Sequence, residues 1–239
     1  MESSLVVRLS FPSSFTESYA PEQREYETQQ LLNYTIQSEL SFSPDSLHFI
    51  GGDFARTGDL SVFWVLSEAK DKILFTPLVI ELRNAPFKVQ SQIAKWLIRQ
   101  LPHFSGGAFD ARGNGQQIAE ELADEFGRHF IQEIKATAEW NNKYFRKLAE
   151  VLQQQSLIIP DDRDIALDLA AITLEKGLPK IPEKRINTAN GQRHCDSVVA
   201  LIMAIAASET RKPIYSAQID PPVTLKITQK LRQGESDEN

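Results

Sequence analysis

The spacing of apolar residues changes period several times between residues 47 and 208, and this order limits the folds open to the chain. Three strand-like runs come first, and segments of helical spacing then alternate with short strands. An antiparallel meander followed by such alternation predicts one mixed α/β sheet with helices on both faces. The expected strands are 47–55, 60–66, 72–82, 107–111 and 129–135, and the expected helices are 85–101, 114–126, 140–154 and 194–208.

The segments outside this pattern are polar. Residues 1–44 are rich in Ser, Glu and Gln, with one weak helical pattern over 22–40, and they predict a lead-in or linker segment. Residues 209–239 contain three prolines and end in a polar run, which predicts a poorly ordered tail. The folded domain is therefore expected over residues 45–208.

The composition narrows the class of protein. A chain of 239 residues with 41% hydrophobic and 24% charged residues suits one large globular domain. No apolar run approaches the roughly 20 residues of a membrane helix, and the start has no signal-peptide pattern. The single cysteine, Cys195, excludes an internal disulfide framework and fits a reducing cytoplasm. The net charge of -6 argues mildly against a large DNA-coating surface, although one basic strip could still hold DNA.

Two carboxylates surround a glycine-bounded turn after the first expected strand. Asp53 ends that strand directly after Gly51 and Gly52, and Asp59 follows across the turn. Asp is a poor strand residue, and the glycine pair lets other groups approach Asp53 closely. These features favour a functional role for Asp53 over a turn-capping one. For Asp59 the turn role and the functional role stay equally open.

Two further aspartates lie at the boundaries of expected elements. Asp110 joins a strand to a helix, where ligands gather in α/β sheets, although an N-cap would also explain it. The Gly-rich stretch after Asp110 lacks the Gly-Lys-Ser/Thr of a P-loop, so nucleotide binding is not expected. Asp196 opens the last helix, where the helix dipole alone could explain a carboxylate. The adjacent His194 adds a ligand, proton carrier or phosphate contact.

Three carboxylates from separate elements at one sheet edge would repel one another without a counter-charge. Asp53, Asp110 and Asp196 are therefore expected to bind Mg²⁺ or Mn²⁺, which prefer oxygen ligands. Two such ions about 3.5–4 Å apart can activate a water and stabilise the leaving oxygen in phosphodiester cleavage. One Cys and four His give no tetrahedral zinc site, and a serine hydrolase is not expected because Gly-x-Ser-x-Gly is absent.

Basic residues lie close to these aspartates in the sequence. Arg56 and Arg112 could contact the scissile phosphate or pair with the neighbouring aspartates. A second group lies in a segment with Gly and Pro that we expect to be a loop or hairpin leading to Asp196. It could grip DNA phosphates, and an ordinary solvated loop is equally open. This group includes Lys180, Lys184, Arg185 and Arg193.

In this order the motifs resemble the C-terminal nuclease domain of phage and prophage large terminases, above all the Mu-like forms. The resemblance covers about residues 47–208 and implies an RNase H-like fold and two-metal-ion cleavage of double-stranded DNA during genome packaging. By this match Asp53, Asp110 and Asp196 are the catalytic metal carboxylates. Asp59 matches an auxiliary metal position and His194 an auxiliary catalytic one. The motifs are Gly-Gly-Asp53, Arg56-Thr-Gly-Asp59, Phe-Asp110-Ala-Arg-Gly-Asn-Gly and Arg-His194-Cys-Asp196.

The resemblance also implies partners and a location. A packaging ATPase domain, a small terminase subunit and a portal protein would be its partners, in the cytoplasm of a bacterial host. The chain departs from the family in having no Walker A motif, which suggests an excised domain or a shortened prophage remnant. A second departure is Cys195, which stands where the family has a small residue.

Two other hypotheses stay open. A non-catalytic assembly module that binds a portal or small terminase subunit would need no divalent ion. Another RNase H-like nuclease, such as a junction resolvase, would prefer branched over linear DNA.

Overall fold

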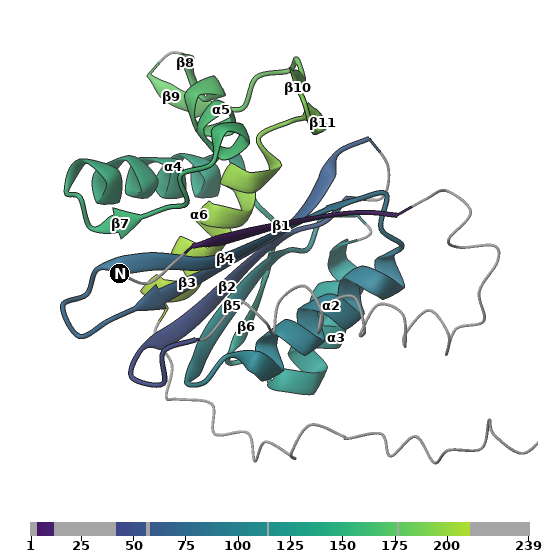
Figure 1. Cartoon of the computed structure of the whole chain (residues 1–239), viewed down its shortest axis with the longest axis vertical. Coiled ribbons are helices and arrows are strands. Elements are labelled where there is room, and N and C mark those ends of the chain that lie inside the picture. The colour runs from purple at the N-terminus through teal and green to yellow at the C-terminus, as the bar shows by residue number, and fades with distance from the viewer. Residues whose placement is uncertain (1–3, 12–41, 56–57, 114, 176, 211–239) are drawn as a thin grey trace, which may run out of the picture.

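A seven-stranded mixed sheet forms the centre of the computed structural model, which describes residues 4–11, 42–55, 58–113, 115–175 and 177–210 (Figure 1). The strand order is β1-β4-β3-β2-β5-β6, and β7 also pairs with β4. Neighbours among β2, β3 and β4 are antiparallel, whereas β1–β4, β2–β5 and β5–β6 are parallel. This arrangement confirms the predicted meander and mixed sheet. The strands are β1 (Leu5–Ser10), β2 (Leu47–Asp53), β3 (Leu60–Glu68), β4 (Leu74–Arg83), β5 (Phe104–Asp110), β6 (Ile131–Ile134) and β7 (Leu157–Ile158).

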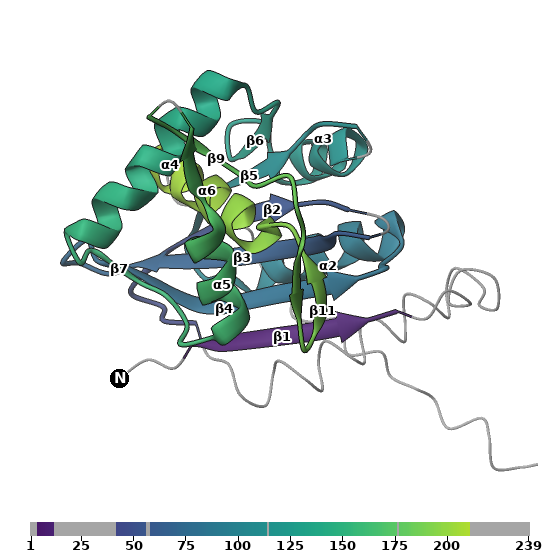
Figure 2. The same ribbon diagram turned by 90° about the horizontal axis from the view of Figure 1, so that it is seen from above.

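Helices cover both faces of the sheet, as predicted (Figures 1 and 2). On one face lie α2 (Phe87–Gln100) and α3 (Gly115–Phe126), and on the other α4 (Ala138–Gln153), α5 (Arg163–Ala171) and α6 (Asp196–Glu209). Each layer of helices packs on the sheet through its own apolar cluster. None of the helices in the described ranges has both the length and the apolarity needed to cross a membrane.

Three elements differ from the sequence-based expectation. Residues 1–44 are predicted to lead into the domain, whereas Leu5–Ser10 forms the edge strand β1 and pairs in parallel with Leu78–Arg83 of β4. The strand β7 and the helix α5 were not predicted either. The weak helix expected over 22–40 lies outside the described residues, as do residues 211–239 of the tail expected over 209–239.

The segment before α6 forms two small antiparallel hairpins. One pairs β8 (Thr173–Glu175) with β9 (Leu178–Lys180), and the other pairs β10 (Ile186–Thr188) with β11 (Gly191–Arg193). The expectation of a loop or hairpin is thereby confirmed. Figure 1 shows both hairpins on the α5 side of the sheet.

Helix α6 lies directly on β2 because Gly51 has no side chain. A Cβ atom at Gly51 would lie 2.0 Å from the carbonyl oxygen of Ala200 and 2.3 Å from the nitrogen of Ala204. Every residue of α6 from Asp196 to Ser208 is buried, which fits a helix that is apolar on nearly all sides. The contact therefore determines both the distance of α6 from the sheet and its position along β2.

We expect Gly51→Ala to lower the free energy of unfolding by about 1–3 kcal/mol or more, because the added methyl group meets backbone that cannot rotate away. Urea denaturation measures this change. Gly106→Ala is the matched control, since Gly106 also lies in a buried strand under α6. Its Cβ would lie 3.5 Å from the carbonyl oxygen of Ala207, an ordinary contact. Equal losses in the two variants would contradict the proposed role of Gly51.

Candidate active site

The register of the sheet places Asp53 beside Asp110. They are the last residues of the parallel neighbours β2 and β5, and Gly52 is paired with Phe109 immediately before them. Alternate residues of a strand share a face, so Asp53 lies on the same face of the sheet as Gly51, toward α6. Asp110 shares the α6 face for the same reason, because a Cβ at Gly106 in β5 would face the end of α6.

Asp196 reaches the same edge from α6. It is the first residue of the helix, one turn before Ala200, which contacts Gly51. One helical turn rises about 5.4 Å and two strand residues span about 6.6 Å. The steps from Ala200 to Asp196 and from Gly51 to Asp53 are therefore similar in length. The structure thus brings together the three aspartates that the sequence singles out, from β2, β5 and α6.

The pKa of Asp53 lies well above its usual range. Burial of the carboxyl is the largest cause, followed by the negative charges of Asp196 and Asp110. The charge of Arg112 and the backbone N–H of Phe54 act in the opposite direction. Asp53 is therefore held among like charges in a setting that disfavours its ionised form.

Asp196 has a similar but smaller shift. Burial is the main reason that its pKa rises to about 6, and Asp59 and Asp168 add to the rise. Two backbone N–H groups lower it, since those of Leu60 and His194 donate to Oδ2 at 3.3 and 3.2 Å. These hydrogen bonds hold the Asp196 carboxyl in one orientation.

Arg112 engages both carboxyl oxygens of Asp110. Its Nε lies 2.9 Å from Oδ1 and 3.1 Å from Oδ2, and Nη2 lies 2.7 Å from Oδ2. The backbone N–H of Arg112 also donates to Oδ1 at 3.0 Å. The Arg112 side chain is 54% exposed, so it can swing into solvent. A cation that binds Asp110 has to displace this guanidinium.

The donor set suits a hard divalent cation. Among the described residues, Arg or Lys side chains form ion pairs with Asp110 and Asp59 but not with Asp53 or Asp196. Oxygen ligands with uncompensated charge match Mg²⁺ and Mn²⁺ better than zinc. Within the described ranges, no three acidic, His or Cys side chains stand close enough to hold an ion without moving. Release of the bidentate contact with Arg112 would free both carboxyl oxygens of Asp110.

Asp59 and His194 lie at the margin of this cluster. Asp59 pairs with Arg185, whose Nε is 2.8 Å from Oδ1. The His194 ring is bonded elsewhere, with Nε2 2.7 Å from the carbonyl oxygen of Pro182, and only its backbone contacts Asp196. Metal binding by Asp59 and proton transfer by His194 remain predictions.

Arg193 corrects the sequence analysis. It is predicted to contact DNA, but its side chain is only 1% exposed and forms ion pairs with Glu81 and Asp168. A guanidinium enclosed in this way cannot reach a phosphate. One signal was present, because Glu81 interrupts the apolar run of β4, and a charge buried in a strand requires a partner.

The other predicted DNA contacts are distributed unevenly. Arg185 is next to the cluster through its ion pair with Asp59, and Lys184 is exposed beside it. Lys180 pairs with acidic residues of its own segment, Glu175 and Glu183. Arg56 lies outside the described residues.

We expect Asp53→Asn to stabilise the metal-free protein at pH 7.5. A carboxyl whose pKa is raised in the folded state binds its proton more tightly there than in the unfolded chain. Its contribution to the free energy of unfolding is therefore present below the unfolded pKa near 4 and is lost as pH rises through the pKa of the folded state. Removing the charge should add on the order of 1–3 kcal/mol. Thermal unfolding in EDTA from pH 4 to 8 measures this.

The control for this experiment is Asp124→Asn, at an exposed position in α3. The increase in stability of Asp53→Asn over the wild type should grow with pH, whereas Asp124→Asn should have the same pH dependence of stability as the wild type. A gain that is the same at every pH would mean that the Asp53 charge is not its cause.

Two known proteins are similar to most of this chain, while no family model matches it. Mu-like prophage FluMu protein gp28 of Haemophilus influenzae is 35% identical over 168 residues, covering 70% of this chain and 33% of its own length. The probable terminase, large subunit gp28 of Escherichia phage Mu is 35% identical over 206 residues, covering 85% of this chain and 37% of its own length. The chain thus spans about a third of the length of these relatives.

Solved structures of large terminase nucleases share the fold. The large terminase nuclease of thermophilic phage G20c with bound magnesium superposes with a TM-score of 0.53 and 24% identity, covering 70% of this chain and 85% of that one. The Thermus phage P74-26 large terminase nuclease domain gives 0.50 and 22%, with coverage of 70% and 82%. These identities show the fold alone. Sequence and fold agree that the chain is homologous to about a third of two gp28 proteins, one of them a probable terminase large subunit, and has the RNase H-like fold shared by large terminase nuclease domains.

Proposed function

We propose that this chain is a divalent-metal-dependent DNA endonuclease that cleaves phosphodiester bonds by a two-metal-ion mechanism in phage-type genome packaging. The convergence of Asp53, Asp110 and Asp196 at one edge of the sheet carries the proposal. The pKa of Asp53 supports it, since burial and the charges of the other two aspartates raise it. Of the similar nucleases, that of phage G20c was solved with bound magnesium.

The three aspartates would hold Mg²⁺ or Mn²⁺, and Asp59 offers a further carboxylate on the adjoining turn. Bound ions of this kind lower the pKa of water and neutralise charge on the leaving oxygen. The fold supplies rigid placement: Asp53 and Asp110 lie on paired strands, and backbone N–H groups orient the Asp196 carboxyl. Pre-positioned ligands reduce the cost of ordering the site when DNA binds.

Arginines next to the aspartates would bind the phosphates. Once released from Asp110, Arg112 presents an exposed guanidinium suited to bidentate contact with the scissile phosphate. Arg185 and Lys184 lie on the neighbouring segment, where exposed cations can contact the DNA backbone. His194 would have to leave Pro182 before its ring could carry a proton.

The partners follow from the relatives. Because the chain spans about a third of two gp28 proteins, of which the phage Mu protein is a probable terminase large subunit, we propose that it works with a packaging ATPase domain. A small terminase subunit and a portal are the further proposed partners. The host cytoplasm is the proposed site of action.

Cleavage of supercoiled plasmid tests the function directly. We expect nicking and linearisation with Mg²⁺ or Mn²⁺, none in EDTA, and a loss of at least about 10²-fold in Asp53→Asn and Asp196→Asn, as for removal of other groups that stabilise transition-state charge. Asp124→Asn should cleave like the wild type. Full activity in both site variants would overturn the proposal.

The same preparation separates the alternatives. A folded protein that neither cleaves DNA nor binds Mn²⁺ would favour the non-catalytic assembly module. Preferential cleavage of four-way junctions over linear duplex would favour a junction resolvase.

We also expect Arg112→Ala to separate metal binding from cleavage. Because Arg112 competes with a cation for Asp110, its removal should tighten Mn²⁺ binding by about two- to fivefold, the scale of a partly exposed ion pair. Cleavage should fall, since a phosphate contact is lost. Isothermal titration measures the first effect and plasmid nicking the second. Arg128→Ala, which removes an exposed arginine of another ion pair, should change neither. Weaker Mn²⁺ binding in Arg112→Ala would contradict the competition.

A further inference from the structure

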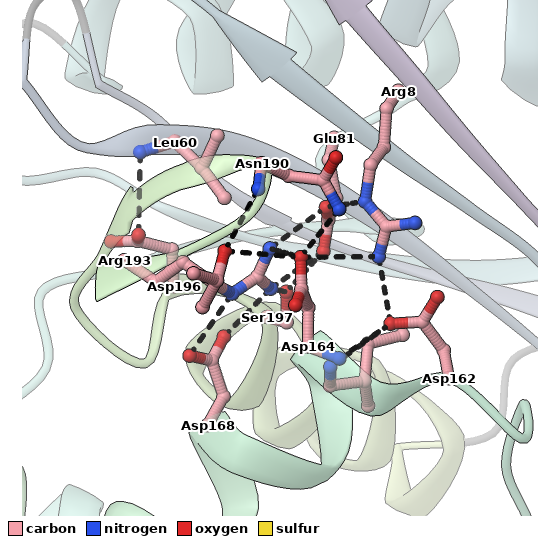
Figure 3. Close-up of polar contacts among 12 residues, drawn as sticks. Arg8, Leu60, Glu81, Asp162, Asp164, Asp168, Asn190, Arg193, Asp196 and Ser197 are labelled. Carbon is pink, nitrogen blue, oxygen red and sulfur yellow. Dashed lines mark hydrogen bonds and ion pairs between the residues drawn. The ribbon is translucent and has the colours of Figure 1, made fainter. Parts of the chain in front are cut away.

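Arg193 lies at the centre of a buried ionic network beside the candidate active site (Figure 3). Its Nη2 and Nη1 lie 2.6 and 2.9 Å from the two carboxyl oxygens of Glu81. Its Nη2 and Nε lie 2.8 and 3.2 Å from those of Asp168. The guanidinium therefore hydrogen-bonds two carboxylates, a third carboxyl oxygen, Oδ2 of Asp164, lies 3.9 Å from Nη1, and the pKa of Arg193 is raised despite burial.

The network joins three elements at the start of α6. Glu81 belongs to β4, Asp168 to α5, and Ser197 to the first turn of α6. Nη2 of Arg193 donates to the Ser197 hydroxyl at 2.7 Å, and that hydroxyl donates to Glu81 at 2.9 Å. The first turn of α6 is thus tied to both the sheet and α5.

Asp196 lies between the two anchored residues of this network. Arg193 comes three residues before it and Ser197 directly after it, and Cys195 between them adopts a left-handed conformation with φ 63°. A non-glycine residue in this conformation persists only where its surroundings impose it. The anchored residues lie on both sides of this bend, and Asp196, which follows it, lies close enough to Asp53 for the two charges to interact.

Net stability alone does not account for such a network. Buried ion pairs lose much of their Coulomb energy to desolvation, and apolar residues of similar volume often serve as well or better. Several buried polar contacts in one network do specify a single geometry. A site built from carboxylates on different elements requires such a fixed geometry, because each carboxylate must be held in place relative to the other.

We propose that Arg193 is a positioning residue for Asp196, acting through Glu81, Asp168 and Ser197. Its consequence for metal binding rests on the function proposed above, whereas its effect on the Asp196 carboxyl does not. Asp196 accepts from the backbone N–H groups of Leu60 and His194, so exchange of these two amides reports its position without metal or DNA.

Amide hydrogen exchange by NMR on the metal-free protein tests this proposal. We expect Ser197→Ala and Arg193→Lys to speed exchange at Leu60 and His194 by about tenfold relative to amides in the middle of β3, which report global stability. Mn²⁺ affinity, measured by electron paramagnetic resonance, should weaken by a similar factor in both variants.

The matched control is Arg8→Gln. Arg8 pairs with Glu81 at 2.8 Å and with Asp162 at 2.7 Å, at the outer end of the network and away from α6. This variant should leave both amides and the Mn²⁺ affinity as in the wild type, even where it lowers the melting temperature. Unchanged protection of Leu60 and His194 in folded Ser197→Ala would overturn the proposal. A wild type that binds no Mn²⁺ would instead overturn the metal site, and the exchange data would still decide the role of Arg193.

Discussion

The close approach of α6 to β2 at Gly51 is the contact on which the arrangement of the acidic cluster depends. Backbone meets backbone there, so no change of rotamer can alter the spacing. From this contact, Asp53 lies two residues along β2 and Asp196 lies one turn along α6, so the fold itself determines the distance between them. The parallel pairing of β2 with β5 likewise determines the position of Asp110 relative to Asp53.

The carboxylates of the cluster are compensated unequally. Arg112 neutralises Asp110 and Arg185 neutralises Asp59, whereas burial raises the pKa of both Asp53 and Asp196. Under the proposed function, this unfavourable burial of unpaired carboxylates is a loss of stability accepted where a cation would bind, a trade that is common at catalytic sites.

Much of the fold, and the convergence of three aspartates at one edge of the sheet, could be predicted from the sequence. Asp53 and Asp110 each end a clearly apolar strand, and Asp196 begins a clearly apolar helix. Neighbouring parallel strands that end at the same edge of a sheet bring their last residues together. Helix α5 escaped prediction because two of its three buried residues, Asp164 and Asp168, are charged and so break the apolar spacing that marks a helix.

The elements that escaped prediction depend on distant partners. Strand β1 stands apart from the apolar pattern of residues 47–208, in a stretch that is polar overall, and pairs with β4 some seventy positions away (Leu5 with Leu78). The sequence predicts a phosphate contact for Arg193 because it ends the basic segment that leads to Asp196. Its burial depends on Glu81, 112 residues away. Local patterns carry no information about such pairings.

Strand β1 also covers an edge that would otherwise be open. Without it, Leu78–Arg83 of β4 would present unpaired backbone groups, and exposed strand edges of this kind recruit other chains. Glu81 would at the same time lose its outer arginine. A shortened protein that began at residue 45 would therefore tend to self-associate, so strand β1 protects the fold against aggregation.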